Sequence, residues 1–198
     1  KAVGELDWEM DDDVQILTIG RPDQDSKKIF LENYGNDFPY DEINQRRFDY
    51  VEKIVKTRGV PLKPGAKEML IEVRRIGLIL GLATSTPAVR ARFLLEKAGL
   101  WDFFHTAIFG DQVIRGKPEP DIFLLSAEKI GVPPKQCIVF EDSTSGILAA
   151  SAANMWPILV PDVIKPAKEV INRAYHQYPD LLVAIDDLKS LLKRIEAQ

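Results

Sequence analysis

Two neighbouring carboxylates, Glu141 and Asp142, directly follow a short apolar run over residues 137–140. Four apolar residues of this kind predict a strand that is buried on both faces, as the strands of parallel sheets are. Acids just past the carboxyl end of such a strand lie where open α/β sheets bind their ligands. Because adjacent carboxylates repel each other unless a cation lies between them, the pair indicates a hard, oxygen-binding ion such as Mg2+. The alternative is that both acids only precede the next helix, with Ser143 as its N-cap.

Two further groups at predicted strand ends could bind an anion. Thr84 and Ser85 follow an apolar run and come just before Pro87, which begins a predicted helix, so hydroxyls and helix amides lie together. Lys117 lies in a loop in which two of the next three residues are prolines that stiffen the backbone, and a fixed lysine is suited to neutralising phosphate. Taken singly, the hydroxyls fit helix capping as well as anion binding, and a lone loop lysine is usually solvated. Together with the acidic pair, on three successive strand ends, they favour one phosphate- and metal-binding site.

The elements that must position these groups alternate between helices and strands from residue 61 onward. The pattern predicts helices over about 64–75, 87–98, 119–130 and 144–153 and from about 186, and strands over 78–83, 106–109, 137–140, 157–160 and 181–185. Such alternation predicts an α/β fold with a doubly wound parallel sheet and right-handed crossovers. Residues 1–60 instead contain two amphipathic helical segments, over about 25–34 and 41–58, followed by a linker rich in turn-forming residues.

The bulk composition excludes several classes of protein. The chain has 198 residues, of which 45% are hydrophobic and 28% charged, as in an ordinary globular protein. A net charge of −4 argues against a general nucleic-acid binder, and no apolar run is long enough to span a bilayer. The single cysteine, Cys137, excludes a disulfide framework and fits a reducing compartment. We therefore expect a cytoplasmic protein, a monomer, that binds neither nucleic acid nor membrane.

Three stretches carry a resemblance to a known family. They are residues 82–85 (Leu-Ala-Thr-Ser), 116–123 (Gly-Lys-Pro-Glu-Pro-Asp-Ile-Phe) and 139–143 (Val-Phe-Glu-Asp-Ser), the last followed by Gly-Ile at 146–147. They resemble the second, third and fourth motifs of the haloacid dehalogenase-like superfamily, and look most like its phosphatase and β-phosphoglucomutase branch. The matched stretch covers about residues 61–160.

This resemblance implies a fold, a cofactor and a reaction. The fold is a Rossmann-like α/β core over residues 61–198 with a small helical cap domain over residues 1–60. The reaction is phosphoryl transfer from a small phosphorylated metabolite through an aspartyl-phosphate, with Mg2+ as cofactor. Members of the superfamily that cleave carbon–halogen bonds do not need the metal, so the acidic pair favours the phosphate branch.

The resemblance also implies a role for each motif residue. The implied site consists of Thr84 and Lys117 as catalytic residues, Thr84, Ser85 and Lys117 as phosphate ligands, Glu141 and Asp142 as Mg2+ ligands, and Arg21 as a substrate-binding residue from the cap. In these roles Lys117 offsets the charge of the transferring phosphoryl group and the metal clamps its oxygens.

The family's first motif, an apolar strand followed by Asp-x-Asp, has no counterpart in this sequence. Residues 11–13 are all aspartate but no buried strand precedes them, and Asp186-Asp187 lacks a second acid two positions further on. The resemblance places the missing strand between those that end at Thr84 and Glu141. We therefore expect the nucleophilic aspartate upstream of Lys1, on a strand of a longer enzyme. The alternative is a truncated protein that is inactive or depends on a strand from elsewhere.

Three functions fit these observations. The first is a Mg2+-dependent phosphatase that acts on a small phosphorylated metabolite such as a sugar phosphate. The second is a β-phosphoglucomutase-like phosphomutase, for which a cap lysine is expected; residues 51–53 (Val-Glu-Lys) lie in the corresponding region. The third is a non-catalytic protein that binds phosphorylated metabolites and lacks the nucleophile.

Overall fold

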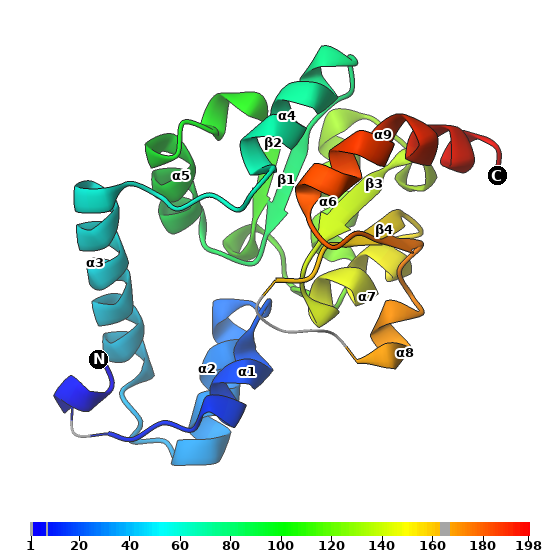
Figure 1. Ribbon diagram of the computed structural model, residues 1–198. Coiled ribbons are helices and arrows are strands. Elements are labelled where there is room, and N and C mark those ends of the chain that lie inside the picture. Colours follow the sequence, from blue (N-terminus) through cyan, green and yellow to red (C-terminus); the bar gives the residue numbers. More distant parts are fainter. Residues whose placement is uncertain (1, 7, 163–166) are drawn as a thin grey trace.

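The computed structural model describes residues 2–6, 8–162 and 167–198, so residues 1, 7 and 163–166 of the two predicted domains lie outside the described residues. The helices are α1 (Asp12–Thr18), α2 (Asp23–Tyr34), α3 (Tyr40–Arg58), α4 (Ala66–Arg75), α5 (Ala88–Lys97), α6 (Asp121–Ile130), α7 (Thr144–Ala152), α8 (Lys168–Ile171) and α9 (Leu181–Glu196) (Figure 1). The strands are β1 (Gly81–Thr84), β2 (Thr106–Phe109), β3 (Ile138–Glu141), β4 (Trp156–Leu159) and β5 (His176–Gln177). Short 3-10 helices cover Gly4–Leu6, Trp101–Phe103, Gly110–Gln112 and Pro134–Gln136.

Helices α1 to α3 form a helical part that lies to one side of the remaining chain (Figure 1). Its core is aromatic: the rings of Phe30 and Phe38 stack with their centroids 5.4 Å apart, and the Tyr40 ring lies 5.5 Å from that of Phe30. Gly35 and Gly59 end α2 and α3 as the sequence predicts, both with positive φ angles that favour glycine. The boundary between a cap and a core at residue 60 stays a prediction.

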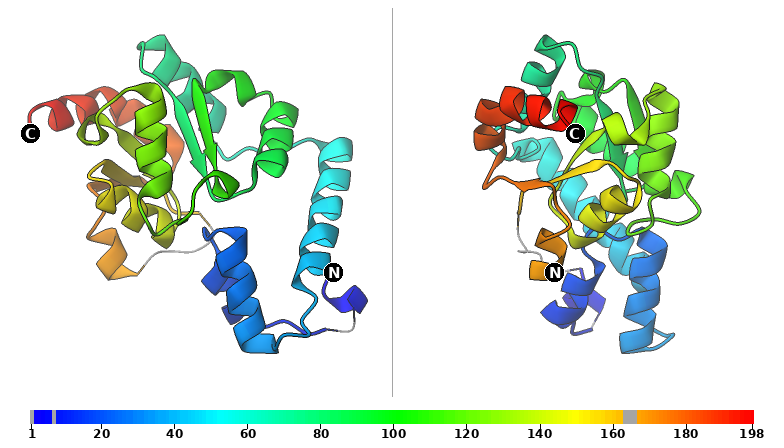
Figure 2. Two further views of the ribbon diagram at one scale, coloured as in Figure 1. Left: turned by 180° about the vertical axis from the view of Figure 1, so that it is seen from behind. Right: turned by 90° about the vertical axis from the view of Figure 1, so that its right-hand side faces the viewer.

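The α/β part, from α4 to α9, places helices on both faces of parallel strands. On one face, Met69 and Val73 of α4 pack with Leu188 and Leu191 of α9 against Ile158 of β4. On the other face, α6 and α7 share a second apolar cluster with β2, and Figure 2 shows α6 crossing the strands on the side opposite α4. The predicted mixed α/β class with parallel strands is therefore confirmed.

The strands nevertheless form two sheets instead of one. β1 pairs only with β2, and β3 pairs with β4, which pairs with β5; within the described residues no strand lies between β1 and β3. Both apolar clusters include residues from or beside β1 and residues of β3, so the two sheets lie side by side under shared helices. Every residue of β1 and β3 is exposed or half-buried, whereas β4 is almost wholly buried. The unpaired edges of β1 and β3 define a slot, at the position expected for the missing strand.

The prediction of a strand over residues 181–185 is wrong, because these residues form the first turns of α9. The Asp180 side chain accepts a hydrogen bond of 2.9 Å from the backbone N–H of Val183 and so caps the helix. Ala184, Leu188 and Leu191 then fall on one buried stripe at helical spacing. The last strand is the two-residue β5 instead, and the short helices α1 and α8 were not predicted.

The other predicted elements are confirmed. The strand over 106–109 has the expected bounds, α9 begins at Leu181 instead of about 186, and the remaining bounds differ by at most three residues. Within the part of the chain that the structure describes, no helix is both long enough and apolar enough to cross a membrane.

Candidate functional site

A cavity of about 1670 Å3 opens between the helical part and the carboxyl ends of β1 and β3. Its lining includes all the residues that the sequence singled out, namely Arg21, Thr84, Ser85, Lys117, Glu141 and Asp142. It also extends along the slot, because Leu82 of β1 and Phe140 of β3 line it. The structure thus brings the six residues together around one cavity, and their chemical roles stay predictions.

Lys117 connects the two sheets at the inner end of this cavity. Its side chain is only 6% exposed and pairs with the Glu141 carboxylate, which is 9% exposed. The ammonium group also donates a hydrogen bond of 3.2 Å to the Ala83 carbonyl at the end of β1 and lies 4.7 Å from the centre of the Phe123 ring. A buried ammonium with these contacts is held in one place, as a group that neutralises phosphate must be. The alternative of a solvated loop lysine is therefore wrong.

The loop after β3 fixes Glu141, the first acid of the pair. Ser143 is the N-cap of α7, since its hydroxyl accepts a hydrogen bond of 3.0 Å from the Gly146 N–H, and it also donates to Glu141 at 3.0 Å. A Cβ atom at Gly146 would lie 2.0 Å from a Glu141 carboxylate oxygen, so only glycine allows this approach. Ser143 therefore does cap the helix, and its hydroxyl positions Glu141 at the same time.

Asp142 faces the cavity without an ion pair to any described residue. Desolvation by the cavity walls and then the charge of Glu141 raise the pKa of Asp142, while Lys117 lowers it by a smaller amount. No group of three or more side chains suited to a metal lies within the described residues. Mg2+, however, usually binds one or two protein carboxylates together with water and substrate phosphate. The Glu141–Asp142 pair fits that donor set.

The hydroxyl groups after β1 do not cap α5. Thr84 Oγ1 instead accepts a hydrogen bond of 3.2 Å from the Thr86 N–H, and the first N–H of α5, from Ala88, donates to the Asp111 carboxylate at 3.1 Å. The sequence analysis missed Asp111, which reaches this helix from the loop after β2. The Ala88 amide is therefore not available to an anion, and a phosphate here would rely on the hydroxyls.

Arg21 enters the cavity from the helical part through a close contact with the core. The Ser85 hydroxyl donates a hydrogen bond of 2.9 Å to the Gly20 carbonyl, and Gly20 has a φ of 78°. A Cβ atom at Gly20 would lie 2.6 Å from the Ser145 hydroxyl oxygen, so glycine is needed on both grounds. This contact holds Arg21 next to the strand ends.

Sequence reasoning missed a polar group on the opposite wall of the cavity. Asn44 is 6% exposed on the buried side of α3, and it lines the cavity together with Arg47, Lys53 and Arg90. The available signal was an asparagine next to Ile43 on an otherwise apolar helical stripe, because a buried amide needs polar partners.

Comparison with known proteins gives a family. The family model described as haloacid dehalogenase-like hydrolase matches residues 1–154. A phosphorylated carbohydrates phosphatase from Thermotoga maritima is 34% identical over 144 residues, which cover 73% of this chain and 66% of that protein. A probable pseudouridine-5'-phosphatase from Drosophila melanogaster is 31% identical over 76% of this chain and 67% of its own length.

Solved structures agree on the fold. A β-phosphoglucomutase from Clostridium difficile superimposes with a TM-score of 0.82 at 22% sequence identity, covering 100% of this chain and 88% of that one. At this identity the likeness concerns the fold alone. The family match covers more than half of the chain and coincides with the three motifs and their cavity. The chain therefore belongs to the haloacid dehalogenase-like hydrolase family.

Proposed function

We propose that this protein is a Mg2+-dependent phosphatase that hydrolyses a small phosphorylated metabolite, such as a sugar phosphate, through an aspartyl-phosphate. The observation that carries the proposal is the convergence of a hydroxyl, a buried ammonium and an acidic pair at one cavity beside β1 and β3. The similarity to proteins named as phosphatases supports the same conclusion. The helical part acts as the cap that covers the substrate.

Each residue has a proposed task in this reaction. Thr84 and Ser85 bind the oxygens of the transferring phosphoryl group, and Lys117 offsets the charge that these oxygens carry. Glu141 and Asp142 hold Mg2+, which neutralises and orients the phosphate oxygens when it is bound. Arg21 binds the substrate from the side of the helical part.

The slot is the proposed place of the nucleophile. Among the residues that the structure describes, none pairs as a strand with these two edges, and a parallel strand between β1 and β3 would pair with the backbone N–H and C=O groups of both. The carboxyl end of that strand would lie between Thr84 and Glu141, next to Lys117. An aspartate at that position would face a phosphate bound between Thr84, Glu141 and Lys117. We propose that such a strand, from the same polypeptide or from a partner chain, completes the site.

The test measures release of inorganic phosphate from p-nitrophenyl phosphate by the protein as its gene encodes it. We expect turnover only with Mg2+, and a loss of about 100-fold or more in Lys117→Ala and in Asp142→Ala. The exposed residues Lys135 and Asp186 lie outside the cavity lining, so Lys135→Ala and Asp186→Ala are matched controls with unchanged activity. Metal-independent turnover, or full activity in Lys117→Ala, would contradict the proposal. Phosphate binding without turnover would favour the non-catalytic alternative.

The position of the nucleophile has a separate test. Mass spectrometry of the trapped phosphoenzyme identifies which aspartate carries the phosphoryl group. The proposal requires an aspartate on a strand outside residues 1–198, and a phosphorylated aspartate within those residues contradicts it.

One observation favours a phosphomutase as the second candidate. Lys53 of α3 lines the same cavity, at the place where the sequence analysis expected a cap lysine for a mutase. Interconversion of hexose phosphate isomers without net release of phosphate, lost in Lys53→Ala, would select this reaction. Net phosphate release that is unchanged in Lys53→Ala would select the phosphatase.

A further inference from the structure

A buried amide on the cavity wall opposite the acidic pair holds two arginines. The Asn44 side-chain oxygen accepts a hydrogen bond of 3.0 Å from Arg47 and another of 3.1 Å from Arg90. Arg47 comes from α3 in the helical part and Arg90 from α5 in the α/β part. One oxygen atom therefore brings together cations from both parts of the molecule.

The orientation of this amide is fixed from behind. The Asn44 side-chain nitrogen donates a hydrogen bond of 2.6 Å to the Asp23 carboxylate, and the Tyr40 hydroxyl donates to the same oxygen at 2.9 Å. With its nitrogen held by Asp23, the amide can only present its oxygen toward the two arginines. Burial and the Asp23 carboxylate raise the pKa of Tyr40, so its hydroxyl stays a donor. Asp23, the acid of this group, therefore already accepts hydrogen bonds from two neutral donors, the Asn44 amide and the Tyr40 hydroxyl.

The two arginines have no carboxylate partner among the described residues, although their neighbours on the same helices do. Arg46 on α3 pairs with Glu42 at 2.7 Å, and Arg92 on α5 pairs with Glu96 at 2.7 Å. Arg47 and Arg90 instead share a neutral oxygen, and this places their bonded nitrogens no more than about 6 Å apart. Like charges at this distance repel each other unless an anion lies between them.

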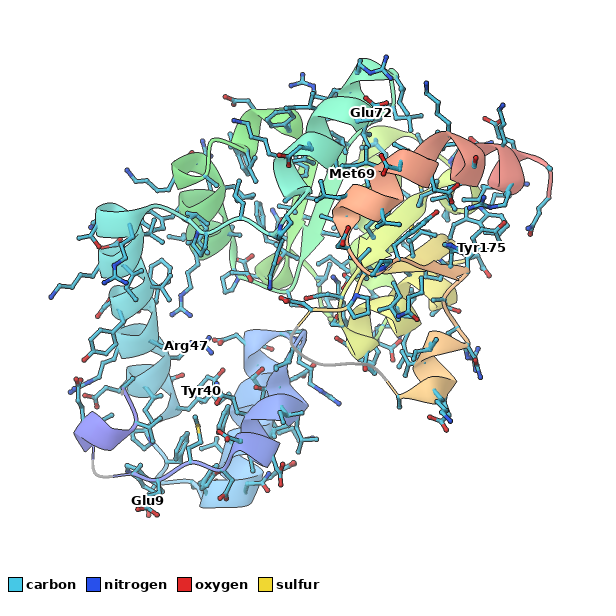
Figure 3. The ribbon with its side chains drawn as sticks, in the orientation of Figure 1. Glu9, Tyr40, Arg47, Met69, Glu72 and Tyr175 are labelled. Carbon is cyan, nitrogen blue, oxygen red and sulfur yellow. The ribbon has the colours of Figure 1, made fainter. Side chains whose placement is uncertain are left out.

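The surroundings keep both guanidinium groups at the cavity. Both arginines line it, and Arg90 also stacks over the Phe48 ring at 4.9 Å. Figure 3 shows Arg47 on the side of α3 that faces the space enclosed by α1, α2 and the α/β part. A guanidinium has five N–H donors, and the bond to Asn44 uses one in each arginine. Most of their donors remain available to a ligand in the cavity.

We propose that Arg47 and Arg90 form an anion clamp that binds a second anionic group of the substrate. This inference rests on the proposed function, in which the transferring phosphoryl group binds at Thr84 and Lys117. The substrate class is then a small phosphorylated metabolite whose other end carries a carboxylate or a second phosphate. Because the clamp joins α3 to α5, a substrate bound there contacts both the helical part and the α/β part.

The test compares three ligands that differ only at carbon 1. Glucitol 6-phosphate ends in a neutral hydroxymethyl group, 6-phosphogluconate in a carboxylate and glucitol 1,6-bisphosphate in a phosphate. Their dissociation constants are measured by titration calorimetry with Mg2+ present, for the native protein and for Arg47→Gln and Arg90→Gln. We expect the native protein to bind one or both of the doubly anionic ligands about tenfold more tightly than glucitol 6-phosphate. Each arginine variant should lose most of this preference and bind glucitol 6-phosphate as the native protein does.

The matched controls are Arg46→Gln and Arg92→Gln, which remove paired arginines from the same helices and should leave the preference unchanged. Thermal melting shows that each variant is folded, and Arg47→Lys, which keeps the charge, should keep part of the preference. Equal affinity of the native protein for all three ligands would overturn the clamp, as would equal weakening of all three in the arginine variants. Which doubly anionic ligand binds more tightly distinguishes a carboxylate from a phosphate.

Failure of the proposed function gives a different result. Asp142→Asn should weaken all three ligands alike if Mg2+ holds the common phosphate. If it changes none of them while the arginine variants behave as expected, the clamp stands and the metal-dependent phosphatase is wrong.

Discussion

The inner strands β1 and β3, which border the slot, are less buried than β2 and β4, the strands paired with them, although β5 at the far end of its sheet is exposed. Central strands are normally the most buried, because helices cover both faces and neighbours cover both edges. Here Ile158 and Leu159 of β4 are fully buried, while every residue of β1 and β3 keeps some exposure. The faces of the inner strands are covered by α6 and α9, so the exposure arises at their unpaired edges.

The less buried strands, β1 and β3, are also the strands that carry residues of the candidate site. The groups that β2 and β4 contribute to the core are apolar. Thr84 and Glu141, in contrast, end the inner strands β1 and β3 and line the cavity. Within the described residues, β1 and β3 therefore have unpaired edges beside the candidate site. Substitutions beside the slot and substitutions away from it should therefore change the free energy of unfolding by different amounts.

The largest effect is expected from Lys117, whose side chain spans the slot. Lys117→Met leaves the buried Glu141 carboxylate without its partner, which typically costs about 3–5 kcal/mol of unfolding free energy. The double variant Lys117→Met/Glu141→Leu should recover most of this loss, since no buried charge remains. Urea unfolding followed by circular dichroism measures both. Lys135→Met, at an exposed lysine, is the control. If Lys117→Met and Lys135→Met lowered the unfolding free energy equally, the buried ion pair would be contradicted.

The next prediction compares two isoleucines of the β3–β4 pair, one on each strand, opposite Trp156 and Phe140. Ile158→Ala in β4 removes a fully buried side chain and should cost about 2–5 kcal/mol. Ile138→Ala in β3 removes a half-buried one and should cost about 1 kcal/mol, because less apolar area is returned to water. The same urea experiment measures the two costs. Equal costs would show that Ile138 in β3, beside the slot, is as well packed as Ile158 in β4.

A smaller effect is expected at the β1–β2 sheet, where β1 has its only strand partner. The Asp111 carboxylate, in the loop after β2, accepts the first N–H of α5, the helix that follows β1. Asp111→Ala should cost about 0.5–2 kcal/mol, as the loss of a helix N-cap does. Asp102→Ala removes an exposed acid nearby whose backbone carbonyl, and not its side chain, makes a contact with Arg74, and it should have little effect. Thermal melting of both variants makes the comparison.

The sequence predicted which residues lie together at the cavity better than it predicted how the strands pair. Local signals were enough for Lys117 and the acidic pair, because strand ends are marked by an abrupt change from apolar to polar residues. The strand that carries the nucleophile stays a prediction, and within the described residues the structure shows only that no strand lies between β1 and β3. Strand pairing depends on residues that lie far apart along the chain, so local patterns could not predict how open the slot between β1 and β3 is.

The errors have a common cause. An apolar run such as residues 181–185 fits a strand and a helix equally well, and the N-cap hydrogen bond of Asp180 decides between them. Asn44 and Asp111 were missed because their partners, Arg90 and the Ala88 amide, lie more than 20 residues away along the chain. Contacts of this kind follow from the fold and cannot be read from spacing.

The smallest effect is expected far from the slot, where polar side chains join the chain after β5 to α9. The Asp187 carboxylate of α9 accepts hydrogen bonds from Arg194 at 2.7 Å and from the Tyr178 hydroxyl at 2.6 Å, next to β5. The Arg194 hydrogen bond, then that of Tyr178, lowers the pKa of Asp187 to about 2 from an ordinary value of 3.8. Since the side chain of Asp187 is 34% exposed and that of Arg194 is 43% exposed, Asp187→Asn should cost no more than about 1 kcal/mol at pH 7.

The pH dependence of this cost follows from the direction of the shift. A carboxylate with a lowered pKa stabilises the folded state above its ordinary pKa and loses that contribution as the pH falls toward the lowered value. The difference between native protein and Asp187→Asn should therefore be constant at neutral pH and shrink between about pH 4 and pH 2. Urea unfolding at pH 7, 4 and 2.5 measures it, with the exposed neighbour Asp186→Asn as the matched control. A difference that persists at pH 2.5, or one that is as large in Asp186→Asn, would mean that the contacts of the Asp187 carboxylate with Arg194 and Tyr178 do not stabilise the fold.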